Sequence, residues 1–190
     1  NKTLNNLKNK GIFGKVNSRI VDGSDPNLKI IEIEVEEKAT GEISAGAGVG
    51  TGGSSIGFAV KENNYLGKGV QLDTNISISN TSITGIFSIN NPNFNNTDNS
   101  LFTKFSSTQV DKITDFGYKT NITGVSFGSN FEKYEDLFYF PSISINHEKL
   151  ETTSTASAAL KKQDGNYFET NFNYTLDYDK RNQKYQPTSG

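Results

Sequence analysis

The sequence predicts a mainly β protein: an antiparallel transmembrane β-barrel preceded by part of a small α+β module. Three observations support this fold class. From residue 39 onward, apolar and polar side chains alternate along segments long enough to cross a bilayer. The turns between these segments differ in composition between the two ends of the predicted strands, and no stretch has a convincing helical period. We therefore divide the chain into a module, residues 1–38, and a barrel segment, residues 39–190.

The module is expected to contain a short helix and two strands. Residues 1–10, NKTLNNLKNK, carry leucines at helical spacing and are followed by Gly11, a residue type that commonly ends a helix. A strand is predicted near residues 15–21, and after the turn DGSDPN a second strand alternates isoleucine and valine with glutamate. We interpret the acidic side of that strand as a solvated face, made by Glu32, Glu34, Glu36 and Glu37.

The barrel segment is expected to contain about eight strands. Several exceed the usual soluble strand of roughly five or six residues, and most reach the roughly 9 to 11 residues that a tilted strand needs to cross a bilayer. The last strand is the clearest, because its aromatic and aliphatic side chains share one face and its acidic and amide side chains share the other. The predicted strands lie near residues 41–50, 54–66, 68–80, 82–93, 100–111, 114–131, 136–149 and 166–181.

Alternation alone leaves two architectures open. A barrel has a polar lumen, and a soluble β-sandwich has a polar outer surface, so both alternate. The turns favour the barrel, because every turn at one end carries an aromatic residue, as is typical of the periplasmic interface of an outer-membrane barrel. In the sandwich, the same rings would cover the end of the core. The predicted aromatic rim comprises Tyr65, Phe94, Phe131, Tyr134 and Tyr185.

Composition excludes several classes of function. The net charge of -2 argues against recognition of nucleic acid through a general basic field. With no Cys and a single histidine, His147, the chain has neither a disulfide framework nor a thiolate or histidine-rich metal centre, so we expect no metal and no cofactor. Mean hydropathy of -0.57 argues against transmembrane helices but not against membrane-spanning strands. The absence of Met, even at position 1, predicts a processed chain or an excised segment.

The stretch GAGVGTGG contains G-x-G-x-x-G at Gly48, Gly50 and Gly53, the spacing of a dinucleotide-binding loop. Such a loop must open a helix, because the pyrophosphate binds the N–H groups of the helix N-terminus. The residues that follow alternate with the period of a strand, so we predict that this stretch is not a nucleotide site.

Several motifs resemble those of the BamA family of outer-membrane protein assembly factors. ENNYLGKG, INNPNF and DKRNQKYQPTSG occur in that family's order, GEISAGAGVGT is similar to its first barrel strand, and residues 4–38 resemble the second half of its last POTRA domain. The likeness thus spans essentially the whole chain. The matching turn positions are Leu66, Gly67, Gly69, Asn91, Pro92, Phe94, Pro187, Thr188 and Gly190.

The resemblance implies a barrel of roughly sixteen strands, an even number as in other bacterial barrels, of which this chain would hold the N-terminal half. It also implies that residues 1–38 are the C-terminal part of a POTRA-like periplasmic domain. The family's lumenal loop with an Arg-Gly-Phe motif has no counterpart in these residues. A half barrel would have two unpaired edges, so we expect that this piece does not fold alone.

The resemblance further implies that the first barrel strand is a lateral gate at which client strands pair. Glycine weakens a strand, so a seam made with this strand should open easily. As an alternative, the glycines ease curvature or the approach of a lumenal loop. The gate residues implied are Glu42, Ile43, Ser44, Ala45, Gly46, Ala47, Gly48 and Val49.

The function implied is that of an outer-membrane protein assembly factor of a Gram-negative bacterium, not an enzyme, with no catalytic residue. Its partners would be outer-membrane lipid, unfolded outer-membrane protein clients and periplasmic accessory lipoproteins, and no nucleic acid. Three alternatives stay open: a POTRA-barrel transporter that secretes a protein client, a small self-contained structural barrel, and a soluble all-β binding module.

Overall fold

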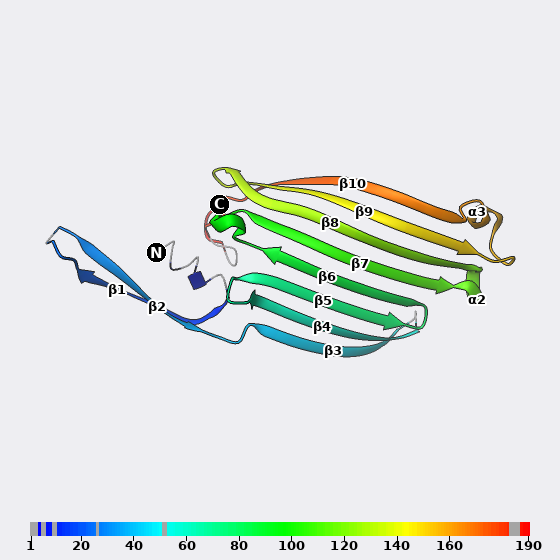
Figure 1. The fold of residues 1–190 in the computed structure, drawn as a ribbon, viewed down its shortest axis with the longest axis horizontal. Coiled ribbons are helices and arrows are strands. Elements are labelled where there is room, and N and C mark those ends of the chain that lie inside the picture. The colour runs from blue at the N-terminus through cyan, green and yellow to red at the C-terminus, as the bar shows by residue number, and fades with distance from the viewer. Residues whose placement is uncertain (1–3, 5–6, 9–10, 26, 51–52, 183–186) are drawn as a thin grey trace.

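The computed structural model describes residues 4, 7–8, 11–25, 27–50, 53–182 and 187–190. These residues form two antiparallel sheets, one of two strands and one of eight (Figure 1). The small sheet and the C-terminus lie toward the same end of the large sheet (Figure 1). The mainly β fold predicted from the alternation is confirmed.

The small sheet contains the two strands expected in the module, β1 (Phe13–Asp22) and β2 (Lys29–Glu37). Val16 pairs with Val35 and Ile20 with Ile31, so the apolar side chains of both strands share one face. The other face carries ion pairs between the strands, from Lys15 to Glu36 and from Arg19 to Glu32, in agreement with a solvated acidic side.

The predicted N-terminal helix lies largely outside the described residues. Leu4, Leu7 and Lys8 are helical. Gly11 has a φ of 69°, and its N–H donates to the Lys8 carbonyl at 3.2 Å. A left-handed glycine that closes a helix in this way is the termination predicted from the sequence.

The large sheet is a meander in which each strand pairs with its neighbours in sequence, in the order β10-β9-β8-β7-β6-β5-β4-β3. Each of the eight strands predicted from the sequence is present, and most bounds agree within a few residues. The strands are β3 (Gly41–Gly50), β4 (Gly53–Tyr65), β5 (Val70–Ser79), β6 (Ser82–Asn91), β7 (Ser100–Lys112), β8 (Tyr118–Tyr134), β9 (Leu137–Thr152) and β10 (Gly165–Tyr178).

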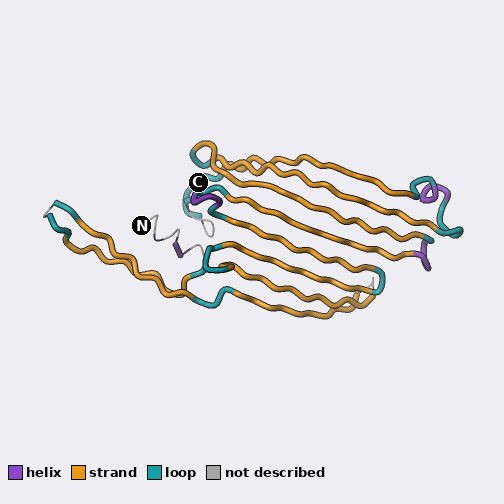
Figure 2. Tube along the Cα trace, in the orientation of Figure 1, coloured by secondary structure: helices purple, strands orange, loops and turns teal. Residues whose placement is uncertain are grey.

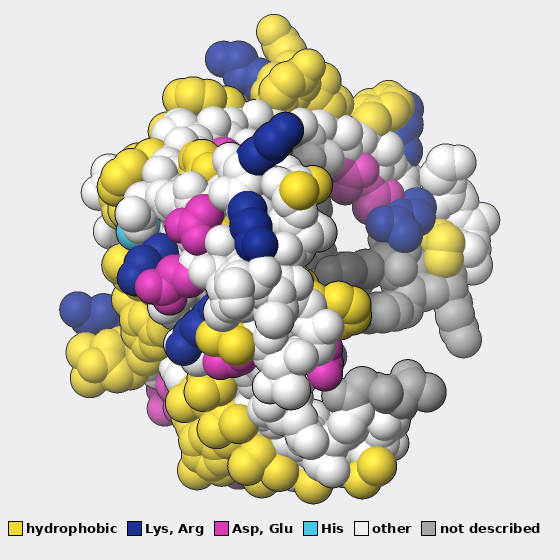
Figure 3. Space-filling view, turned by 90° about the vertical axis from the view of Figure 1, so that its right-hand side faces the viewer, with side chains coloured by type: hydrophobic (Ala, Val, Ile, Leu, Met, Phe, Trp, Pro, Cys, Tyr) yellow, Lys and Arg dark blue, Asp and Glu magenta, His cyan; other side chains and the backbone are white. Residues whose placement is uncertain are grey.

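The register gives the large sheet one apolar and one polar face, because directly paired residues point to the same side. On the apolar face, which we call outward, Phe58 pairs with Ile76, and Phe87 with Phe105. The opposite, inward face carries mainly serine, asparagine, glycine and charged residues along the same strands. Seen end-on, the molecule is hollowed, and hydrophobic side chains gather along its outer boundary (Figure 3).

The described residues form neither a sandwich nor a closed barrel. No second sheet covers either face of the large one, and β3 and β10 lie at opposite edges without pairing to each other. Leu150 and Ala156 are the buried hydrophobic residues of the described chain. The large sheet therefore exposes its apolar face instead of enclosing a core.

Two helical turns at the far end of the sheet were not predicted: α2 (Ile113–Phe116) and α3 (Ala158–Lys161). Both are too short to produce a helical period. Because α2 ends at Gly117, which has a φ of 73°, β8 begins four residues later than the strand predicted from residue 114. A 3-10 turn, η1 (Phe94–Asn96), lies in the loop between β6 and β7.

Among the described residues, no helix is long and apolar enough to cross a membrane.

Candidate functional site: the first strand of the large sheet

The predicted gate residues all lie in β3, at one edge of the large sheet. β3 pairs with β4 on one side, in a register that sets Ile43 opposite Val60 and Ala45 opposite Phe58. Within the part of the chain that the structure describes, no strand pairs with its other side. All ten residues of β3 are exposed, and Ile43 and Val49 on the outward face expose 73% and 87% of their surface.

On the inward face, Glu42 lies opposite Lys61, and beyond this pair β3 and β4 carry only serine, alanine and glycine. Ser44 lies opposite Ala59, Gly46 opposite Gly57 and Gly48 opposite Ser55. Cross-strand side-chain contacts contribute about 0.2–1 kcal/mol per pair in an antiparallel sheet. The Gly46–Gly57 pair supplies no such contact, so backbone hydrogen bonds hold β3 to β4 on this face with little help from side chains.

Neither backbone conformation nor crowding requires glycine at the middle of β3. The glycines of β3 do not have positive φ, and a Cβ added at Gly46 or Gly50 would meet no atom within 4 Å. A Cβ at Gly48 would make an ordinary contact, 3.7 Å from Ser55 Oγ. What these glycines change is therefore the side-chain contact and chain entropy of the strand, each of which lowers its stability.

Side chains anchor β3 at its N-terminal end, beside the connection to the small sheet. Thr40 Oγ1 donates to Glu62 Oε1, and Asn63 Nδ2 donates to the Thr40 carbonyl at 3.2 Å. The same carboxylate accepts the Asn64 N–H at 2.6 Å. The strand is thus held firmly at its entry and weakly along its length.

Four of the five predicted rim aromatics lie at or near the ends of β4, β6 and β8. These strands end on the side of the large sheet nearest the small sheet (Figure 2). Tyr65, Phe94 and Tyr134 are exposed, and Phe131 stacks on Tyr139 with ring centroids 5.7 Å apart. Tyr185 lies outside the described residues.

The opposite end of the sheet also carries an aromatic pair that the turn composition did not predict. Phe116, in α2, and Tyr118, at the start of β8, have ring centroids 6.5 Å apart. The alternation of the sequence predicted both residues in a strand instead of a turn. Aromatic residues therefore flank both ends of the large sheet.

The first family turn motif has a clear structural reason. Leu66, Gly67 and Gly69 all have positive φ, between 56° and 70°, a conformation that glycine adopts without steric cost. Asn64 closes this turn, because its carbonyl accepts the Gly67 N–H at 2.9 Å and its Oδ1 accepts the Gly69 N–H at 2.7 Å.

The two other motifs are also built on asparagine side chains that bind backbone N–H groups. Asn91 Oδ1 accepts the Asn93 N–H at 3.1 Å just after Pro92, and the Phe94 N–H donates to the Asn99 carbonyl at 2.8 Å. In the last motif, Asn182 Oδ1 accepts the Thr188 N–H at 3.1 Å. Pro187 and Gly190 lie in the same described stretch, residues 187–190. Side-chain closure of this kind is the local chemistry that favours asparagine in turns.

The glycine-rich stretch does not form a nucleotide loop. Gly53 opens β4, and no helix follows it. Its backbone has a φ of 101°, and the next N–H, of Ser54, donates to Asn80 Oδ1 at 3.2 Å. Among the residues that the structure describes, no group of three or more potential metal ligands comes together.

Residues 64–190 match the Omp85 superfamily domain, which covers the large sheet from the end of β4 onward. The chain belongs to the Omp85 superfamily. The BamA resemblance read from the turn motifs falls within this assignment, and the match includes residues 64–69 of the first motif and the whole of the other two.

The fold of this Omp85 chain is similar to the crystal structure of BamA from Haemophilus ducreyi lacking POTRA domains 1-3, with a TM-score of 0.73 and 22% sequence identity. The match covers 100% of this chain and 39% of the other, so the chain spans about two-fifths of that protein. A comparison with curated proteins gave no match.

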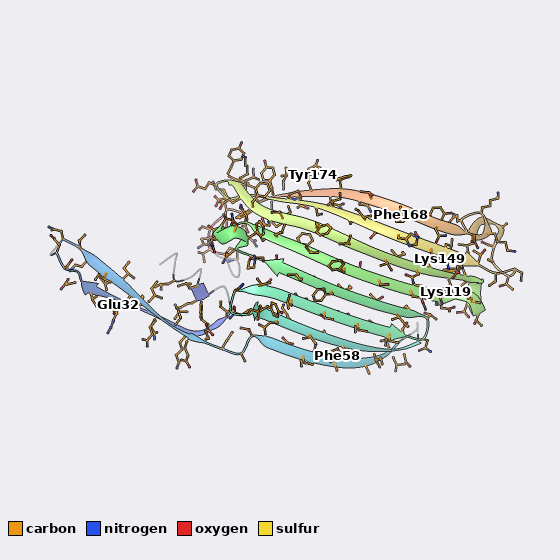
Figure 4. The ribbon with its side chains drawn as sticks, in the orientation of Figure 1. Glu32, Phe58, Lys119, Lys149, Phe168 and Tyr174 are labelled. Carbon is orange, nitrogen blue, oxygen red and sulfur yellow. The ribbon has the colours of Figure 1, made fainter. Side chains whose placement is uncertain are left out.

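Superfamily membership places this Omp85 chain in the outer membrane of Gram-negative bacteria, as part of a β-barrel. The outward face of the large sheet is accordingly the face that meets lipid, and the inward face lines the lumen. Phe58, on the outward side of β4 beside β3, is one of these lipid-facing residues (Figure 4).

Proposed function

We propose that the chain is part of an outer-membrane protein assembly factor, in which the free edge of β3 templates the folding of client β-barrels. The observation that carries this proposal is the combination found in one strand: an unpaired edge, full exposure and an inward face that carries only serine and glycine beyond Glu42. Superfamily membership and the BamA-like fold support the same role.

The physical basis of templating is the cost of an open edge in lipid. Unpaired backbone N–H and C=O groups in hydrocarbon cost several kcal/mol each, so an exposed edge favours pairing with any strand that reaches it. A client strand that pairs with β3 satisfies both edges at once, as in β-augmentation of soluble sheets. No covalent step is involved, and burial of the client's own lipid-facing side chains drives the reaction.

A templating edge must also release its partner. Side-chain contacts hold a strand in place, and the Gly46–Gly57 pair and its small neighbours withhold those contacts on the lumenal side of β3. The hydrogen bond between Thr40 and Glu62 meanwhile keeps β3 attached to β4 at its N-terminal end. β3 is therefore suited to change partners along its length without leaving the sheet.

We further propose that residues 1–38 form the C-terminal part of a POTRA-like periplasmic domain and that residues 39–190 form the first half of the barrel. The small sheet supports this division, because its apolar face has no cover among the described residues, as expected of part of a larger domain. A cavity of about 530 Å³, lined by residues that include Phe13, Gly67 and Pro92, lies between the small sheet and the rim turns. The module therefore adjoins the aromatic rim, and this supports the proposal that the rim lies on the periplasmic side of the membrane.

In this proposal the partners are outer-membrane lipid, unfolded barrel clients at β3, and accessory lipoproteins at the periplasmic module. The module offers strand edges and an acidic face to such lipoproteins. Nucleic acid is not among the partners, in keeping with the net charge of -2.

Site-directed crosslinking tests the templating role. The chain contains no Cys, so Ala45→Cys in the full-length protein introduces the sole thiol of this segment, at the free edge. Gly85→Cys on β6 is a matched control, because it faces outward, has open space for a Cβ and lies in a strand paired on both sides. A client with a cysteine moved along its terminal strand is expected to crosslink to position 45 with a period of two residues, and not to position 85.

Equal crosslinking at positions 45 and 85, or no period along the client, would refute the edge as a template. A secretion function predicts a different result, in which the client crosslinks to the lumenal face. Asn75→Cys on the inward side of β5 reports that outcome.

A further inference from the structure

Polar side chains interrupt the outward face of the large sheet near the ends of β7 to β10. Asn121, Lys149 and Asn166 lie in one register row across three strands, and Asp111, Lys119 and Glu151 lie in the next row toward the loops. We call these six side chains the outward polar patch. Their neighbours along the chain point inward, so the patch faces away from the lumen.

The patch borders the lipid-facing apolar surface directly. The next row of the outward face, one step farther from the loops, contains Thr123, His147 and Phe168. The centroids of the His147 and Phe168 rings lie 4.8 Å apart. The row after it contains Val125 and Ile145. Figure 4 shows Lys119, Lys149 and Phe168 close to one another at the loop end, and Tyr174 farther along β10 (Figure 4).

The row of Asn121, Lys149 and Asn166 is apolar on β4 to β6, where Ile56, Ile78 and Ile83 lie in line. This difference is expected at a membrane boundary, because barrel strands tilt by roughly 35–45° and the membrane plane therefore crosses register rows obliquely. On β7 to β10 the apolar band ends at the rows next to the patch, so the patch lies outside the band, toward the loops. The patch is thus placed at the level of the lipid headgroups.

The lysines of the patch have weak partners within the protein. Lys149 Nζ lies 2.7 Å from Glu151, and Lys119 Nζ lies 4.0 Å from Asp111, with all four side chains partly exposed. Exposed pairs of this kind contribute about 0–1 kcal/mol, so an anion at the surface competes with them. Lys119 and Lys149 are diagonal neighbours on adjacent strands, roughly 7–8 Å apart, and long lysine side chains can turn toward a shared group.

We propose that the outward polar patch binds the phosphate groups of membrane lipids, with Lys119 and Lys149 as the cations. The amides of Asn121 and Asn166 supply neutral donors in the same rows, and the Phe168 ring contacts the upper part of the acyl chains. The lipid bound here anchors the β7–β10 side of the sheet at the headgroup level. This inference depends on the outer-membrane location and not on the assembly role.

The test uses the full-length protein in vesicles of phosphatidylcholine and phosphatidylglycerol, with either lipid brominated near its headgroup. The chain contains no Trp, so Phe168→Trp places a fluorescent reporter beside the patch once Trp residues elsewhere in the protein are replaced by Phe. Tyr174→Trp is the matched control, because both side chains are about 80% exposed on the same face of β10 but Tyr174 is distant from the patch.

Brominated phosphatidylglycerol is expected to quench the tryptophan at 168 at least about twofold more than brominated phosphatidylcholine. Lys119→Gln with Lys149→Gln should abolish this preference, and Asp111→Asn with Glu151→Gln should increase it by freeing the lysines. The tryptophan at 174 should show no preference in any variant, and quenching of unchanged strength at this position verifies that the sheet is intact. Equal quenching by both lipids at position 168, no effect of the lysine variant, or a weaker preference in the acid variant would each overturn the proposal.

Discussion

At the scale of single residues, the glycines of the large sheet divide into two groups. Gly46 and Gly85 have open space where a Cβ would lie, whereas a Cβ at Gly128 would overlap the Phe102 ring and lie 2.9 Å from the Pro141 carbonyl oxygen. Phe102 and Gly128 are directly opposite each other on β7 and β8. Glycine is therefore required for packing at position 128 and has another role at position 46.

Gly46→Thr is expected to strengthen β3. Threonine removes the entropy cost of glycine, about 0.5–1 kcal/mol, and suits an extended strand. We expect hydrogen exchange of the β3 amides that bond to β4 to slow by about two- to fivefold. Gly85→Thr is the control on a strand paired on both sides, and it should leave β3 exchange unchanged. Unchanged or faster exchange in Gly46→Thr would contradict the explanation of the weak edge.

Gly128→Ala is expected to destabilise the folded protein by about 1–3 kcal/mol, because the new methyl group overpacks against Phe102. The free energy of unfolding by urea in lipid vesicles measures this effect. Phe102→Ala should make the second substitution at position 128 less costly, since the overlap with the ring is then gone and only the contact with the Pro141 carbonyl oxygen remains. Additive losses in the double variant, or a loss of equal size in Gly85→Ala, would show that the ring is not the cause.

At the scale of elements, the loop from residue 153 to residue 164 is tied to the end of β9. Asp164 Oδ2 accepts the N–H of Thr152 at 2.8 Å and its hydroxyl at 2.7 Å. The hydroxyl bond, followed by the backbone bond, lowers the pKa of the Asp164 carboxyl from its usual value. The loop also contacts the turn before β8, where the Gly117 carbonyl accepts the Thr153 N–H at 2.8 Å.

Acidification should therefore loosen this loop. Because the folded-state pKa of Asp164 is depressed, its contribution is present above the ordinary carboxyl range, about 3.9, and is lost as the pH falls through the lower folded-state value. A nitroxide at Ala159→Cys should stay immobile from neutral pH down to that range and become mobile below it. Asp164→Ala should give a mobile label throughout. A pH-independent, immobile label in both proteins would refute the anchor.

Strand positions were predictable from the sequence because each depends on local alternation and local turn chemistry. The turns at Leu66–Gly69 and Asn91–Phe94 are closed by side chains within a few residues, so their motifs carry the necessary information. The last strand was predicted to reach residue 181 but ends at Tyr178, since its partner begins at Leu137 and the chain turns at Asp136, which has a φ of 63°. The end of β10 thus depends on where β9 begins, which the sequence of β10 alone does not show.

The properties that could not be predicted depend on residues far apart in sequence. The contact between Phe102 and Gly128 and the rows of the outward polar patch arise only when neighbouring strands lie in register. Of the candidate site, the sequence predicted the position of β3 and the alternation of its faces. It could not predict that a Cβ at Gly46 meets open space, because that depends on what β4 places opposite.

At the scale of the whole molecule, the described chain is an amphipathic sheet with two free edges. Its outward face is apolar and contacts lipid, and its inward face is polar and lines an aqueous lumen. Its edge strands β3 and β10 leave backbone groups unpaired on one side. The aromatic side chains with the largest exposed fractions lie on β10, since no neighbouring strand covers its free edge. Phe168, Phe172 and Tyr174 are each about 80% exposed. Such a surface is stable in a bilayer and is an aggregation site in water.

We therefore expect the isolated 190-residue polypeptide to be insoluble or polydisperse in detergent-free buffer and to form β-structure only with detergent or lipid. Among the described residues only Leu150 and Ala156 are buried hydrophobics, too few to hold the sheet in water. Analytical ultracentrifugation with circular dichroism measures both properties. Replacing Phe168, Phe172 and Tyr174 by serine should slow aggregation but not abolish it, because both edges remain unpaired. A monodisperse, protease-resistant monomer in plain buffer would contradict both the lipid-facing assignment of the outward face and the role of the free edges.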